Sequence, residues 1–338
     1  MTFLSRGMWV PAGLLPLLVV LSLLDVRLGS LTITFGDIIR HLVDGEGLSE
    51  SQLTVLTRFR LPRLATALLT GAALPACGLM MQTLFRNPLA GPYVLGISSG
   101  ASFGAAIVVL ASGATGILAT WSLALSAWAG AGAVMILLLA VSVRIKDSMT
   151  LLILGIMFSS GLGAVISILQ YFSEAEALKS FVIWSLGSLG HVTGPRLQLM
   201  TVAILPLLIL SLGLSKSLDG MMLGEEYAAT MGLRVIRLRS LILITTSILA
   251  GTVTAFCGPI GFIGIAVPHI TRIFFGSGRH RVLLPATMLT GMVIMVFSDL
   301  VSQLPGSERM LPISAVTSLI GIPVVFWLVL VNRKTRAV

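Results

Sequence analysis

The sequence predicts an all-α integral membrane protein with about ten transmembrane helices in a single domain, residues 1–338. Apolar residues make up 56% of the chain and charged residues only 10%, and the mean hydropathy is +1.03. These values lie outside the range of soluble globular domains. Apolar stretches of roughly 20 residues, the length that crosses a bilayer, also recur along nearly the whole chain. The polar gaps between them are too short to hold a folded domain outside the membrane.

Charged residues and turns rich in glycine or proline delimit ten predicted spans. In chain order these are Met8–Leu28, Pro62–Phe85, Tyr93–Ala111, Trp121–Val143, Leu151–Phe172, Arg196–Ser215, Ile236–Phe256, Phe262–Phe275, Val282–Gln303 and Leu311–Val331. The first is longer than the apolar core of a signal peptide, and we interpret it as an uncleaved helix. The eighth is short and contains Pro268, which fits a re-entrant or broken helix. Nine or eleven crossings are the alternatives.

The distribution of basic residues predicts the orientation. With the N-terminus in the cytoplasm, most of the 22 lysines and arginines flank cytoplasmic ends of the spans. Both termini are then cytoplasmic, segments 29–61 and 173–195 are periplasmic, and loop 216–235 is cytoplasmic. The net charge of +9 therefore indicates membrane topology, and no nucleic-acid partner is expected.

Several chemical signatures are missing from the sequence. No lysine follows a phosphate-binding glycine loop, so ATP, if it drives the protein, binds to another subunit. Cys77 and Cys257 each stand alone without metal-ligand spacing, and we expect no metal, cofactor or catalytic residue. Asp299 is the one deep acidic residue that the spans offer. An ion-coupled secondary transporter, the alternative function, would need paired intramembrane charges.

Glycines predict close helix packing and one irregular connection. Gly96, Gly100 and Gly104 recur on one helix face, where they allow a neighbouring backbone to approach. The run from Gly258 to Gly264 predicts a tight connection that is enclosed by protein or lines a pathway.

The loop 216–235 contains two predicted short helices punctuated by glycines. Its core reads LDGMMLGEEYAATMG, with Glu225 and Glu226 in the first turn of the second helix, where the helix dipole favours negative charge. Such a helix docks into a groove of a partner or lies on the membrane as an ordinary loop. The pattern alone leaves both interpretations open.

The sequence closely resembles the FecCD-type permeases of bacterial ABC importers, which import iron chelates, haem and cobalamin. The similarity runs from the block RLPR to TGAALPACGLMMQTLFRNPLAGPYVLGISSGASFG, through GPIGFIGIAVPHITR and HRVLLP, to LPISAVTSLIGIPVVFWL, in the family's order and spacing. The family's coupling pattern Gly-Glu-x-x-Ala-x-x-x-Gly is matched by Gly224, Glu225, Ala228 and Gly232, and Glu226 and Ala229 lie within it.

This resemblance implies the type II ABC importer permease fold, with ten transmembrane helices per subunit. It also implies two ATP-binding cassette subunits, a periplasmic substrate-binding protein and a second permease subunit, a homodimer being preferred over a heterodimer. The expected location is the bacterial inner (plasma) membrane. The expected cargo is a ferric siderophore, haem or cobalamin.

The resemblance also assigns roles to individual residues. Arg60 and Arg63 correspond to arginines that dock the binding protein, although anchoring in the membrane interface is the alternative. Asn87, Leu89 and Ser148 match positions near the cytoplasmic gate. Gln303 and Met310 depart from the family, which often has an arginine and an acidic residue there. Glu308 and Arg309 are charged residues near these two positions.

Overall fold

A computed structural model describes residues 3–28, 31, 33–44, 47–111, 117–145, 147–303 and 310–335. Within these ranges every regular element is helical. The ten predicted apolar stretches correspond to α1 (Phe3–Arg27), α4 (Leu61–Leu84), α5 (Ile97–Ala106) with its continuation η2 (Ile107–Ala111), α6 (Ile117–Arg144), α7 (Ser148–Phe172), α9 (Pro195–Gly213), α12 (Val235–Cys257), α13 (Ile263–Phe275), α14 (His280–Ser302) and α15 (Ile313–Thr335).

Shorter helices occupy the predicted loops. They are α2 (Phe35–Asp44), α3 (Glu50–Val55), η1 (Leu56–Arg60), α8 (Ala175–Ser185), α10 (Ser215–Met222) and α11 (Glu225–Thr230). Among the described residues, six helical segments are long and apolar enough to cross a bilayer, and three apolar helices are shorter. The chain is therefore a multi-pass helical membrane protein, while the number of ten crossings stays a prediction.

The third predicted span starts later than the sequence suggested. Residues 92–96 form a turn, and the helix begins only at Ile97. Gly96 precedes it with φ of +78°, a left-handed conformation that a helix interior does not accept. The prediction that this helix starts at Tyr93 is therefore wrong.

Helices approach one another through glycines. A Cβ atom built on Gly78 in α4 would lie 1.5 Å from the carbonyl oxygen of Gly264, at the start of α13. One built on Gly104 in α5 would lie 1.9 Å from the carbonyl oxygen of Ser126 in α6, and Gly100 faces Gly130 in the same way. The close approach predicted for Gly100 and Gly104 is confirmed, since only a residue without a side chain fits there.

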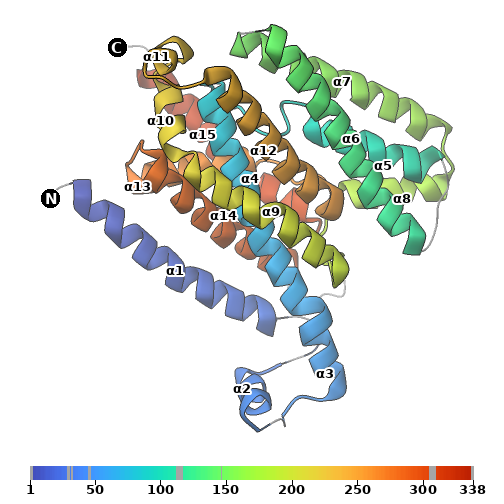
Figure 1. Cartoon of the computed structure of the whole chain (residues 1–338). Helices are drawn as coiled ribbons and strands as arrows, with labels where there is room; N and C mark the ends of the chain where they lie inside the picture. The colour runs from blue at the N-terminus through green and yellow to red at the C-terminus, as the bar shows by residue number, and fades with distance from the viewer. Residues whose placement is uncertain are drawn as a thin grey trace.

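The helices form two packed sets around α4 and α12 (Figure 1). In the first set, α4 packs against α13 and α14, and α1 lies along the outer side of α14. In the second set, α5 packs against α6 and α7, and α12 covers α5 and α6 while also contacting α4. The short helices α2 and α3 project from one end of this bundle, whereas α10 and α11 lie toward the other end (Figure 1).

The glycine-rich connection before α13 is irregular and enclosed, as predicted. Gly258 has φ of +74°, and a Cβ atom there would lie 2.4 Å from the carbonyl oxygen of Trp184 in α8. The backbone N–H of Ser188 donates to the carbonyl of Cys257 at 2.8 Å. The segment that follows α8 therefore fixes this connection from outside.

Candidate functional site

The segment 216–235 contains two short helices that meet at a glycine. Gly224 separates α10 from α11 with φ of +110°, a conformation that residues with a side chain rarely adopt. Glu225 and Glu226 occupy the first turn of α11, as the sequence predicted. Gly232, in the turn that follows α11, has φ of +85°.

The two faces of α11 differ in exposure. The side chain of Ala228 is fully buried within this chain, so a bulkier residue there would first disturb the packing of α11 itself. The exposed face consists of Glu226, Tyr227, Ala229, Thr230 and Met231. Any direct contact of α11 with a partner would therefore use this exposed face, and Ala228 would act only through the position of the helix.

Glu225 is held by an ion pair within the chain. Its two carboxylate oxygens each lie 2.5 Å from Nη2 of Arg239 in α12, a side chain that is itself buried. Nη1 of Arg239 also donates to the carbonyl of Ile145, between α6 and α7, at 3.1 Å. These contacts join α11 to α12 and to the end of α6, because the backbone N–H of Ile145 donates to Val141 of that helix at 2.9 Å.

Asp219 in α10 makes a second polar contact with the bundle. Its Oδ1 accepts from the backbone N–H of His280 at 2.8 Å and lies 2.7 Å from Nδ1 of the same residue. The other ring nitrogen, Nε2, lies 2.7 Å from the hydroxyl of Thr83 in α4. The sequence analysis missed His280 as a functional candidate, although a histidine opening the apolar block HRVLLP was a visible signal.

The predicted gate residues lie in the turn after α4. The side-chain oxygen of Asn87 accepts from the backbone N–H of Leu89 at 2.9 Å, which folds the turn and leaves Leu89 exposed. The carbonyl of Pro88 lies 2.7 Å from Nε2 of His269, which fastens the turn to α13. Ser148 begins α7, but its side chain lies outside the described part of the structure.

Asp147 caps the N-terminus of α7 beside this turn. Its carboxylate accepts from the hydroxyl of Thr150 at 2.5 Å and from the backbone N–H of Thr150 at 2.8 Å. These bonds, the hydroxyl bond most of all, hold the pKa of the Asp147 carboxyl below its ordinary value.

A polar hollow of about 820 Å³ brings together Arg86, in the turn after α4, and the α10–α11 segment. Its walls come from three regions that are far apart in sequence. They are formed by Arg86, Asp147, Leu223, Gly224, Glu225, Glu226, Tyr227 and Thr230. Three of the predicted coupling residues, Gly224, Glu225 and Glu226, therefore share one surface with Arg86 and Asp147, which are the sequence neighbours of the predicted gate residues Asn87 and Ser148.

The two arginines predicted to dock the binding protein point into the chain. Arg60 is buried, and its guanidinium donates to the carbonyls of Val26 at 2.7 Å, Arg27 at 3.1 Å and Leu31. Arg63 forms a paired contact with Asp299, with Nη2 to Oδ1 at 2.7 Å and Nε to Oδ2 at 2.8 Å. Docking through these residues stays a prediction, and neither guanidinium lies free on the surface.

Asp299 has an acidic neighbour that the sequence analysis overlooked. Asp25 in α1 is buried, and Nε2 of Gln303 donates to its Oδ1 at 2.8 Å and to Oδ2 of Asp299 at 3.2 Å. The expectation of one deep acidic residue is therefore wrong. Arg63 also contacts the sulfur of Met310 through Nη1 at 3.0 Å. Glu308 and Arg309 lie outside the described residues.

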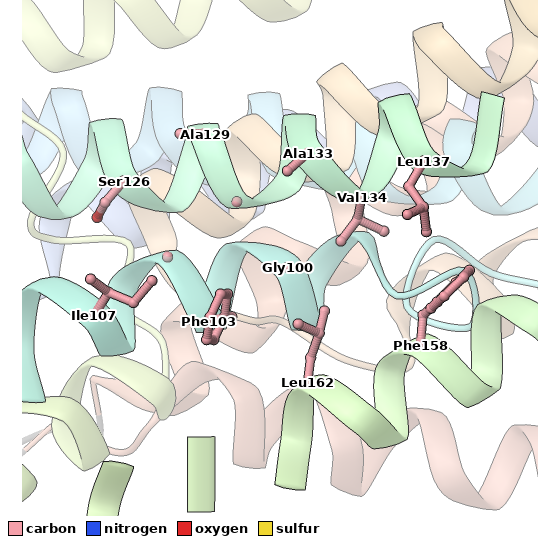
Figure 2. A pocket seen from close by; sticks show the side chains of 12 residues that line it. Gly100, Phe103, Ile107, Ser126, Ala129, Ala133, Val134, Leu137, Phe158 and Leu162 are labelled. Carbon is pink, nitrogen blue, oxygen red and sulfur yellow. The ribbon is translucent and has the colours of Figure 1, made fainter. Parts of the chain in front are cut away.

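An apolar hollow of about 450 Å³ lies between α5, α6 and α7 (Figure 2). Phe103, Ile107 and Leu137 line it together with Phe158 and Leu162 of α7. Its one hydroxyl, that of Ser126, is bonded to the carbonyl of Leu123 at 3.0 Å. The hollow therefore suits hydrocarbon rather than a charged chelate. In the described residues, no group of three or more His, Cys, Asp or Glu side chains could hold a metal ion.

Comparison with known proteins gives a consistent result. Residues 17–331 match the model of the FecCD transport family. The chain is similar to the vitamin B12 import system permease protein BtuC of Klebsiella pneumoniae, with 37% identity over 86% of each chain. It is also similar to the hemin transport system permease protein HmuU of Yersinia pestis, with 34% identity over 96% of each chain.

Solved structures show the same fold. An inward-facing metal-chelate type ABC transporter matches with a TM-score of 0.83 and 31% identity, over 95% of this chain and 98% of that chain. PsaBC of Streptococcus pneumoniae matches in fold alone, with a TM-score of 0.51 and 17% identity, over 84% of this chain and 93% of that chain. The family match and the full-length relatives together show that this chain belongs to the FecCD transport family.

Proposed function

We propose that this chain is the transmembrane permease subunit of a binding-protein-dependent ABC importer in the bacterial inner membrane. Its cargo is an iron chelate, such as a ferric siderophore or haem, or cobalamin. Two ATP-binding cassette subunits hydrolyse the ATP, and a periplasmic substrate-binding protein delivers the cargo. A second permease subunit, preferably an identical chain, completes the pathway. This chain carries out no chemical step itself.

The observation that carries the proposal is the position of the α10–α11 segment. It presents an exposed ridge on α11, while its buried and charged residues contact the helix bundle beside the gate turn. A segment built in this way transmits force between an outside partner and the transmembrane helices. The resemblance to the family's coupling pattern and the similarity to full-length permease relatives indicate that this partner is an ATP-binding cassette subunit.

The exposed face of α7 supports a pathway between two subunits. Besides large apolar side chains such as Ile156, Met157 and Ile168, it carries small and hydroxyl residues, namely Ser160, Gly161, Ala164 and Ser167. The hydroxyls of Ser160 and Ser167 donate to backbone carbonyls of their own helix, each at 3.0 Å. Helix α7 contains no charged residue, which suits a passage that binds its cargo weakly.

In the proposed cycle, the loaded binding protein docks at the end that carries α2 and α3. ATP binding closes the two ATPase subunits, and the α10–α11 segments convert this closure into tilting of the permease helices. The cargo then passes between the two permease subunits. Access alternates because nucleotide and binding protein stabilise different conformations of the same complex.

Reconstitution tests this function directly. The chain is purified with its ATPase subunit, and uptake of cyanocobalamin, haemin and a ferric hydroxamate into proteoliposomes is measured with the binding protein present. We expect uptake of one of these probes that requires both ATP and the binding protein. Uptake by the permease without the ATPase would contradict the proposal.

One observation favours the alternative, an ion-coupled secondary transporter. Asp25 and Asp299 are two buried acidic residues that share one amide donor, and paired intramembrane carboxylates are typical of proton pathways. Arg63 already neutralises Asp299, however, which favours a structural role. The test is uptake of the same probes by the permease alone under an imposed proton gradient. Gradient-driven uptake that Asp25→Asn abolishes would favour the alternative.

A further inference from the structure

The α10–α11 segment is attached to the bundle at two places, one on each side of Gly224. The first link consists of Asp219, His280 and Thr83, and joins α10 to α14 and α4. The second link, formed by Glu225, Arg239 and the carbonyl of Ile145, joins α11 to α12 and the end of α6. The links thus end on different sets of helices.

The first link is a helix cap supplied by a distant part of the chain. Arg279, at the N-cap position of α14, makes no side-chain capping bond. Oδ1 of Asp219 takes its place by accepting from the backbone N–H of His280. A carboxylate at a helix N-terminus is also favoured by the helix dipole. Because His280 is fully buried and contacts Thr83, α10 cannot move without shifting α14 and α4 or breaking these bonds.

The second link is ionic and reaches the other set. Arg239 is buried in α12, and its guanidinium connects Glu225 on α11 with the backbone at Ile145. Charge-assisted hydrogen bonds of this kind are stronger than neutral ones. A displacement of α11 is therefore passed to α12 and to the end of α6, where the connection to α7 begins.

We propose that Asp219 and Glu225 are positioning residues that transmit movement of the α10–α11 segment separately to these two helix sets. The inference rests on the proposed function, because the movement originates in the ATPase subunits. Asp219 controls the set of α4, α13 and α14, and Glu225 controls α12 and the end of α6, from which the chain continues into α7. The turn after α4 and the start of α7 then shift relative to each other by the difference between the two displacements.

Two exposed residues can serve as labelling sites that report movement, one in each of the two helix sets. Leu89 lies in the turn that His269 fastens to α13, and so belongs to the first set. Met149 lies in the first turn of α7, beyond Ile145, and so belongs to the second. Each is replaced by cysteine in turn. The native Cys77 and Cys257 are buried and should not react in the folded protein.

The test uses the complete permease–ATPase complex in inside-out vesicles. The labelling rate of each reporter with a membrane-impermeant maleimide is compared between the nucleotide-free complex and the complex trapped with ATP and vanadate. We expect Asp219→Ala to reduce the trapping response of Leu89→Cys by about 2- to 30-fold, the range of typical coupling mutations, and to spare Met149→Cys. Glu225→Ala should show the opposite pattern.

Matched variants separate positioning from general damage. Asp219→Asn keeps the oxygen that accepts both bonds and should restore the response, and Ser217→Ala, on the same helix without touching the link, should respond like the parent. If Asp219→Ala does not assemble, Asp219→Ser, which keeps a capping oxygen but shortens the reach to His280, replaces it.

The possible failures are distinguishable. Equal loss at both reporters in either variant, or an unchanged response of Leu89→Cys in Asp219→Ala, would overturn the inference alone. If neither reporter responds to trapping in the parent, or the chain does not assemble with the ATPase, the proposed function is overturned and the inference with it.

Discussion

The polar contacts at the two ends of the bundle are organised differently. At the end that carries α2 and α3, Arg60, Arg63 and Gln303 connect α1, α4 and α14, which all belong to one packed set. At the α10–α11 end, the contacts of Asp219 and Glu225 reach both sets. Of these side-chain contacts, movement of one set against the other would load those of the α10–α11 end. We call the contacts of Arg60, Arg63 and Gln303 the clamp, because they hold one set together. The end at which Asp219 and Glu225 connect both sets is the transmission end.

The largest expected effect concerns the sides of the membrane on which the two ends lie. Cysteines are placed at Asp44 in α2 and at Thr230 in α11, both exposed positions. From the distribution of basic residues, Asp44→Cys should react with an impermeant thiol reagent added to intact spheroplasts. Thr230→Cys should react only after the inner membrane is opened. The reverse pattern would invert the orientation and with it the assignment of both ends.

The clamp should depend most strongly on Asp299. Removing it in Asp299→Ala leaves the guanidinium of Arg63, a side chain only 12% exposed, without its carboxylate, which costs about 3 kcal/mol of stability. The measurement is thermal unfolding in detergent, followed by a thiol-reactive dye that reports exposure of the buried Cys77 and Cys257. The exposed Asp44→Ala serves as the control. A difference below about 1 kcal/mol would show that the pair is worth no more than a surface ion pair.

Gln303 should contribute less to the clamp. In Gln303→Ala, the buried carboxylate of Asp25 loses its amide donor, which should cost about 1–3 kcal/mol. The same unfolding assay measures this loss, with the exposed Gln198→Ala in α9 as the control. Equal stability of Gln303→Ala and Gln198→Ala would mean that α1 is not fastened through Gln303.

The smallest expected effect is a pH dependence at the transmission end. The pKa of Asp147 is lower in the folded state, chiefly because of the hydroxyl of Thr150. Its stabilising contribution is therefore complete above the unfolded pKa of about 4 and is lost as the pH falls through the folded value. The difference in melting temperature between the parent and Asp147→Asn should be constant from about pH 5 to 8 and change only below about pH 4. A change near neutral pH would contradict this assignment.

Several parts of the site could be predicted from the sequence. The two short helices around Gly224 followed from glycine positions and acidic residues, and Gly100 and Gly104 were recognised as places of close approach. These features are local, because they depend on backbone conformation or on a repeat along one helix. In contrast, the pairing of Asp25 with Gln303 joins residues 278 apart in sequence, and no local pattern indicates it.

By itself, the sequence determined that the chain is helical and membrane-embedded and where its apolar helices lie. Only the tertiary structure decided which faces are buried. The span that contains α4 and the span of α7 have similar hydropathies, 1.7 and 2.2, yet 78% of the first and 17% of the second are buried inside the chain. The physical reason is that lipid and protein interior are both apolar, so hydrophobicity cannot distinguish them. Helix packing alone selects the partners of each polar side chain.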